Sequence, residues 1–229
     1  MPRKLRVIAD GGIYHVLNRR VGRLPLFDDD GDYKAFEKIL DQVAPLFPVR
    51  ILAYCLMPNH WHLLLCPDMA EAMSIFMQRI TLTHVRRWHA HRRSNGEGPV
   101  YQGRFKSFPI QDDGHLLTVA RYVERNPLRA NLVKKAQNWP WSSLHRRFRR
   151  IPTPWLLGPR QWPVAPPRDW LSWVNRPETA KELDALRRSV NRGAPFGDSA
   201  WQRRTAEKLK LQQTLRNPWR PIREPDPLL

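Results

Sequence analysis

The sequence predicts an α+β fold built around one main core. Between residues 13 and 126, short apolar segments typical of strands alternate with longer segments that have the periodicity of helices. Hydrophobic residues make up 41% of the 229 residues and include ten tryptophans, well above the content of disordered chains. A chain of this length and composition has enough apolar surface to bury a sizeable core.

The first predicted elements are a strand and an amphipathic helix. Residues 13–17 form the first clear strand, and a loop over residues 22–30 follows it. In residues 32–44, apolar side chains recur at spacings of three and four: Tyr33, Phe36, Ile39, Leu40 and Val43. We expect this helical face to pack against a sheet.

A β-hairpin is predicted next. Residues 49–57 and 60–66 are both dense in apolar residues. Pro58 and Asn59 lie between them and suit the centre of a tight turn. The two segments are therefore expected to pair as antiparallel neighbours.

A helix, a strand and a second helix are predicted after the hairpin. Residues 70–91 have a partly apolar helical face, and residues 94–99 then break the chain with Asn, Gly and Pro. A short strand over residues 104–110 leads into a helix over residues 115–126. We expect this helix to stop at Pro127, because proline cannot donate the next helical hydrogen bond.

The order β-α-β-β-α-β-α resembles a ferredoxin-like antiparallel sheet with helices on one face. We assign residues 1–150 to this domain. Six prolines between residues 151 and 167 indicate a stiff connector, which we extend over residues 151–176. Residues 177–229 are expected to form a separate extension with two helices.

The strongly basic composition points to a polyanionic partner. Lysine and arginine number 39 against 21 aspartate and glutamate, a net charge of +18, so nucleic acid is the expected partner. An acidic membrane surface is the alternative, but the chain has no long basic helix with one clean apolar face. It also lacks the apolar region of a signal peptide and a membrane-spanning stretch, so we expect a cytoplasmic protein.

His60, Trp61 and His62 form a His-x-His pattern in the second strand of the hairpin. Because side chains alternate along a strand, both imidazoles are expected on one face and Trp61 on the other. Two neutral imidazoles on one face can share a metal ion. So short a pattern also arises by chance, so an accident of composition is the alternative.

Tyr122 and Asn126 lie one helical turn apart near the end of the last predicted helix. Four residues at about 100° each bring the two side chains within about 40° of one another on the helix surface. They lie beside the apolar stripe of this helix, so helical spacing by itself favours a tyrosine at the edge of the core.

Taken together, these motifs resemble the REP-associated tyrosine transposases, relatives of the single-strand insertion-sequence transposases. The resemblance spans residues 3–143 in family order, which is far more specific than any single motif. Its carriers are Tyr14-His15-Val16 with Arg19, AYCLMPNHWHLLL at 53–65, QGRFKS at 102–107, RYVERNPLRA at 121–130 and WSS at 141–143.

The resemblance implies a nuclease and strand transferase with Tyr122 as the covalent nucleophile. His60 and His62 match the family's metal ligands, and Asn126 matches a polar position that completes the metal site in relatives. The implied cofactor is a divalent metal, Mg²⁺ or Mn²⁺. The implied product is a 5′-phosphotyrosine link with a free 3′-hydroxyl, and because the link keeps the phosphoester energy, rejoining needs no nucleotide cofactor.

The resemblance also implies a single-stranded or hairpin DNA substrate formed by repetitive palindromes, bound by a monomer or homodimer. Arg104, Lys106 and Arg129 match basic positions of the family and, with Arg19, are expected phosphate contacts. Arg146 and Arg147 lie in a basic segment, residues 144–150, that is either a backbone clamp or a solvated face. The extension resembles the tails of some members, which makes DNA recognition a candidate role, but residues 220–229 lack the run of basic residues that this role would need.

Two other functions stay open at this point. If Pro58 and Asn59 form the turn, Cys55 falls opposite His62, and a Cys-His-His cluster would favour zinc and a zinc-dependent phosphoesterase. Alternatively, the chain binds palindromic DNA with little or no catalysis. His15 is a further residue of interest, because its strand is expected to neighbour the metal site.

Overall fold

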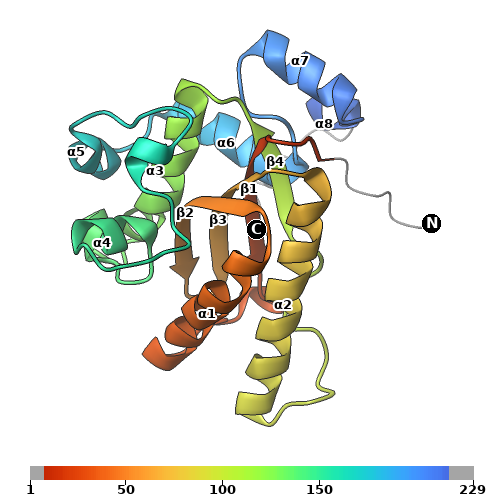
Figure 1. The fold of residues 1–229 in the computed structure, drawn as a ribbon, viewed down its shortest axis with the longest axis vertical. Coiled ribbons are helices and arrows are strands. Elements are labelled where there is room, and N and C mark those ends of the chain that lie inside the picture. The colour runs from red at the N-terminus through yellow and green to blue at the C-terminus, as the bar shows by residue number, and fades with distance from the viewer. Residues whose placement is uncertain (1–7, 217–229) are drawn as a thin grey trace, which may run out of the picture.

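The computed structural model describes residues 8–216 and contains a four-stranded antiparallel sheet with the strand order β2-β3-β1-β4 (Figure 1). The strands are β1 (Ile13–Arg19), β2 (Val49–Met57), β3 (His60–Pro67) and β4 (Lys106–Ile110). β2 and β3 form the expected hairpin, in which Met57 pairs with His60. The order is that of a ferredoxin-like sheet, so the predicted α+β fold is confirmed.

Eight α-helices surround the sheet in the described part of the chain. They are α1 (Asp30–Val43), α2 (Ala70–Arg92), α3 (Gly114–Arg129), α4 (Ser143–Phe148), α5 (Trp170–Asn175), α6 (Ala180–Arg192), α7 (Ser199–Lys208) and α8 (Gln212–Leu215). Asp29 begins α1 by accepting a hydrogen bond from the backbone N–H of Asp32. Within residues 8–216, no helix is long and apolar enough to cross a membrane.

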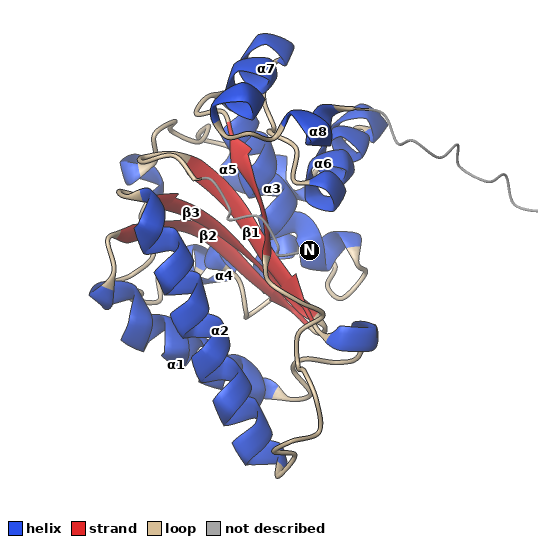
Figure 2. Ribbon diagram, turned by 90° about the vertical axis from the view of Figure 1, so that its right-hand side faces the viewer, coloured by secondary structure: helices blue, strands red, loops and turns tan. Residues whose placement is uncertain are grey.

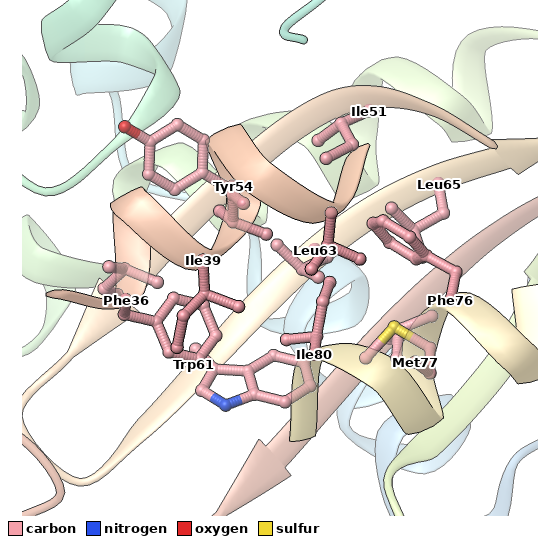
Figure 3. Packing of buried hydrophobic residues seen from close by; sticks show 14 of the residues in the cluster. Phe36, Ile39, Ile51, Tyr54, Trp61, Leu63, Leu65, Phe76, Met77 and Ile80 are labelled. Atoms are coloured by element: carbon pink, nitrogen blue, oxygen red, sulfur yellow. The ribbon is translucent and has the colours of Figure 1, made fainter. Parts of the chain in front are cut away.

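The helices cover both faces of the sheet, which corrects the expectation of helices on one face (Figure 2). α1 and α2 pack on one face around Trp61, which is fully buried among their apolar side chains (Figure 3). α3 packs on the opposite face, over Cys55 and Leu64. The physical reason is that both hairpin strands are apolar at consecutive positions, so each face needs a cover.

α3 extends to Arg129, beyond the end predicted at Pro127. Proline removes one helical hydrogen bond, but the chain closes the last turn in other ways. The backbone N–H of Ala130 donates to the carbonyl of Asn126, and that of Leu132 donates to the carbonyl of Pro127, each at 2.9 Å. These bonds satisfy carbonyls that a helix end would otherwise leave without partners.

The connector and the helical extension pack against the sheet and α3. The backbone N–H of Leu157 donates to the carbonyl of Ile51 at 2.9 Å. Trp162, Leu186 and Phe196 are buried in the same apolar cluster as α3. This packing brings the segment between α5 and α6 against the helix that carries Tyr122.

Candidate metal and nucleophile site

His60 and His62 lie on the α3 face of the sheet, and Trp61 lies on the other face, as the alternation predicted. The centroids of the two imidazole rings are 4.9 Å apart. β3 sits between β2 and β1, so His62 is buried in the middle of the sheet, while His60 lies at the end of its strand. The hairpin therefore sets the spacing of the two rings.

Hydrogen bonds engage one nitrogen of each imidazole. Nδ1 of His60 lies 2.5 Å from Oδ1 of Asn59, which can only accept, so this nitrogen carries a proton in the neutral ring. Nδ1 of His62 lies 2.8 Å from Nε2 of His15. Nε2 of His62 is buried and has no hydrogen-bond partner in the described chain. This arrangement suits a metal ion, which needs a free nitrogen on each ring.

Burial keeps both rings neutral. Desolvation, followed by the nearby charges of Arg19 and Arg129, lowers the pKa of His60 to about 3. Desolvation, followed by the other histidines, lowers the pKa of His62 well below its ordinary value. A neutral imidazole is the form that binds a metal ion.

Tyr122 projects from α3 toward this pair. Its ring centroid is 6.0 Å from that of His62, and the two planes are perpendicular. Its hydroxyl has no hydrogen bond within residues 8–216. Asn126, one turn later, is buried, and its Oδ1 accepts a 3.0 Å hydrogen bond from Nη2 of Arg129. An amide oxygen has two lone pairs, so Asn126 retains one for a second partner.

His60, His62 and Asn126 are the side chains that could hold a metal here, through two imidazoles and one amide oxygen. In the described part of the chain, no three residues among His, Cys, Asp and Glu form a group able to hold a metal. Cys55 pairs with His62 in register, but its thiol donates to Sδ of Met57 at 3.7 Å. Burial, followed by the charge of Glu124, raises the pKa of that thiol well above its ordinary value. A zinc ligand must be a thiolate, so these observations disfavour the zinc alternative.

A basic groove of about 470 Å³ lies beside the histidine pair. Arg19 lines it from the end of β1, where it pairs with His60 in register. Arg104 and Lys106 line it from the segment before and within β4, and Arg192 lines it from α6. Three of the four arginines and lysines predicted by the family motifs to contact phosphate thus meet in one place.

Arg146 and Arg147 point into the protein instead. Arg147 donates to the buried carboxylate of Glu124 at 2.6 Å and to a main-chain carbonyl at 3.1 Å. Arg146 pairs with the buried Glu37. We therefore no longer expect these two side chains to contact the DNA backbone, because buried carboxylates require their charges.

Comparison with known proteins connects this geometry to a family. The model of the IS200-like transposases matches residues 10–126, which include His60, His62, Tyr122 and Asn126. The chain belongs to the IS200-like transposase family. It is 29% identical over 119 residues to a Haemophilus influenzae protein named as a candidate REP-associated tyrosine transposase, with 48% of this chain and 68% of the relative covered.

A solved structure of a REP-associated tyrosine transposase bound to a REP hairpin has a similar fold. The TM-score is 0.53 at 22% sequence identity, and the match covers 69% of this chain and 92% of that chain. This IS200-like chain therefore shares the fold of that protein over most of the latter's length.

Two residues near the site, His15 and Glu178, were given no role by the motifs of the IS200-like family. Nε2 of His15 shares a hydrogen bond with Nδ1 of His62. The sequence feature that pointed to His15 was its place in the strand next to β3. Glu178 binds Arg125 and Arg129 from a segment far along the chain. No local pattern marks Glu178, because its partners lie about 50 residues earlier.

The buried histidines predict acid sensitivity of the fold. Burial lowers the pKa of His15 and His84 to about 3 from an ordinary 6.5. The unfolded chain then binds more protons, so stability is lost as the pH falls below 6.5. Each buried histidine contributes about 1.4 kcal/mol per pH unit well below 6.5. Urea unfolding at pH 7.0, 6.0 and 5.0 measures this slope.

A matched variant separates histidines from carboxylates in that measurement. His84 lies outside the candidate site, and His84→Gln removes one titrating group. The unfolding free energy of this variant should therefore change less steeply with pH, by about 1.4 kcal/mol per pH unit, which corresponds to one proton. Equal stability at pH 7.0 and 5.0 in the unmodified chain would show that the rings are not buried as neutral groups.

Proposed function

We propose that this protein is a metal-dependent single-stranded DNA endonuclease and strand transferase that acts through Tyr122. The observation that carries the proposal is the position of Tyr122, whose ring lies 6.0 Å from the ring of His62. His62 also presents a buried, unpartnered Nε2. The nucleophile and both imidazoles come from one chain, so a single protomer contains the set.

The proposed reaction exchanges one phosphoester for another. The oxygen of Tyr122 attacks the scissile phosphorus, a tyrosine–phosphate bond forms, and the bond to the 3′-oxygen of the departing strand breaks. The products are a 5′-phosphotyrosine link and a free 3′-hydroxyl, and the reverse attack by a 3′-hydroxyl rejoins the strand. A divalent metal, Mg²⁺ or Mn²⁺, held by His60, His62 and Asn126 would polarise the scissile phosphate.

The proposed substrate is hairpin-forming palindromic DNA with a flanking single strand. Arg19, Arg104 and Lys106 line one groove beside the histidines, and a basic groove can follow a single-stranded backbone. The net charge of +18 supports a polyanion. The solved relative with a similar fold is bound to a REP hairpin, which is the reason for choosing a hairpin as the first substrate.

The test is covalent capture of labelled hairpin DNA. The protein is incubated with a hairpin that carries a single-stranded flank and Mg²⁺ or Mn²⁺, and the products are separated in SDS. We expect an adduct that carries the label 3′ to the cut, and its loss in EDTA. Hairpin binding without any adduct in either metal would support the alternative, a palindrome-binding protein without catalysis.

A further inference from the structure

Three arginines on α3 hold the segment between α5 and α6. Arg121, Arg125 and Arg129 follow one another at a spacing of four, which places them along one side of the helix. Arg121 donates to the carbonyls of residues 176 and 177 at 2.8 and 2.7 Å. Arg125 donates to Glu178 at 2.9 Å, and Arg129 donates to Glu178 at 3.0 Å. We call residues 175–178, the last residue of α5 and the three residues that follow it, the strap.

The last of these arginines makes three contacts at once. Nη1 of Arg129 binds Oε1 of Glu178, and Nη2 donates to Oδ1 of Asn126 at 3.0 Å. The guanidinium carbon lies 4.0 Å from the centroid of the Tyr122 ring. A planar guanidinium can fork between two acceptors while its face covers a ring, whereas an ammonium cannot.

Glu178 fixes the position of this guanidinium. Its side chain is only 2% exposed, and its two oxygens accept from two different arginines. A buried carboxylate requires such partners, and removing one leaves an uncompensated charge. Glu178 therefore has one strongly preferred orientation, and its hydrogen bond to Nη1 holds the guanidinium of Arg129 in a fixed position.

We propose that Arg129 is a positioning residue for Tyr122 and Asn126, and that Glu178 acts through Arg129. The strap thus contributes to the active site although it lies outside the matched family region, residues 10–126. This inference rests on the proposed function of Tyr122. It gives Arg129 a role different from the phosphate contact implied by the sequence motifs.

Arg129→Lys tests the proposal, because lysine keeps the positive charge but lacks the planar guanidinium whose two nitrogens bind Glu178 and Asn126. We expect the rate of adduct formation at saturating hairpin DNA to fall about tenfold or more, since small misplacements of reacting groups are costly. The Kd for the hairpin should stay within about threefold, because the charge remains. Arg125→Lys is the matched comparison: Arg125 shares Glu178 but contacts neither Tyr122 nor Asn126, and lysine keeps a charge beside Glu178, so its rate should fall much less than that of Arg129→Lys.

Glu178→Gln tests the second step. It should lower the same rate severalfold, and the double variant Glu178→Gln with Arg129→Lys should be no slower than Arg129→Lys alone, because the two act as one unit. Multiplied losses in the double variant would overturn the action through Arg129. A rise in Kd with a smaller salt dependence in Arg129→Lys would instead show a phosphate contact, and equal losses in Arg125→Lys would show a general effect on the fold.

A readout independent of catalysis separates failure of this proposal from failure of the proposed function. With tyrosine labelled with ¹³C only at Cζ, the five tyrosines of the chain give five signals, and Tyr122→Phe identifies the one from Tyr122. Arg129→Lys and Glu178→Gln should shift this signal in the DNA-free protein, and Arg125→Lys should shift it much less. An unmoved signal overturns the inference, while a moved signal without any adduct on Tyr122 overturns only the proposed function.

Discussion

Replacement of Tyr122 by phenylalanine is expected to abolish the covalent adduct with hairpin DNA. The variant keeps the ring that packs against Arg129 and His62 and removes the oxygen that would attack the phosphorus. Loss of a nucleophile costs on the order of 10⁴-fold or more, so no adduct should appear in SDS after long incubation with Mg²⁺ or Mn²⁺.

The same variant should fold and bind DNA normally. The Tyr122 hydroxyl makes no hydrogen bond in the described chain, so its removal leaves no buried polar group without a partner. The Tm and the hairpin Kd are therefore expected to match those of the unmodified protein. An adduct formed at an unchanged rate by Tyr122→Phe would reject this residue as the nucleophile.

His60→Gln is expected to have the second largest effect. His60 lies at the end of β3 and is partly exposed, so glutamine fits there with little effect on the fold. It removes one of the two imidazoles that would hold the metal. Loss of a metal ligand should cost several kcal/mol of transition-state stabilisation, or about 10²-fold or more in the rate of adduct formation.

A metal titration gives this prediction a second readout. Mn²⁺ binding, followed by electron paramagnetic resonance, should weaken strongly in His60→Gln. The matched control is His91→Gln, which replaces an exposed histidine near the end of α2 and should leave both affinity and rate unchanged. Unaltered Mn²⁺ affinity in His60→Gln would mean that the metal binds elsewhere.

Local patterns predicted the elements that carry the site. The turn at Pro58 and Asn59 fixed the hairpin register, and alternation then placed His60 and His62 on the face opposite Trp61. Helical spacing placed Asn126 beside Tyr122. Helical spacing by itself favoured a structural role for Tyr122, and only the ordered set of family motifs pointed to a catalytic one.

Other features depend on contacts between distant segments, which local patterns do not contain. Arg147 looks like part of a solvated basic run, yet Glu124 from α3 holds it inside the protein. α3 covers the second face of the sheet because that face is apolar too. Glu178 reaches the site only through the packing of the strap on α3.

Locating the attached DNA on the protein tests the role of Tyr122 most directly. The adduct is digested with trypsin and nuclease, and the modified peptide is sequenced by mass spectrometry. Cleavage after Arg121 and Arg125 yields a four-residue peptide with Tyr122 as its single tyrosine. We expect a 5′-linked nucleotide on Tyr122 of this peptide. A nucleotide attached to any other residue would contradict the proposed mechanism.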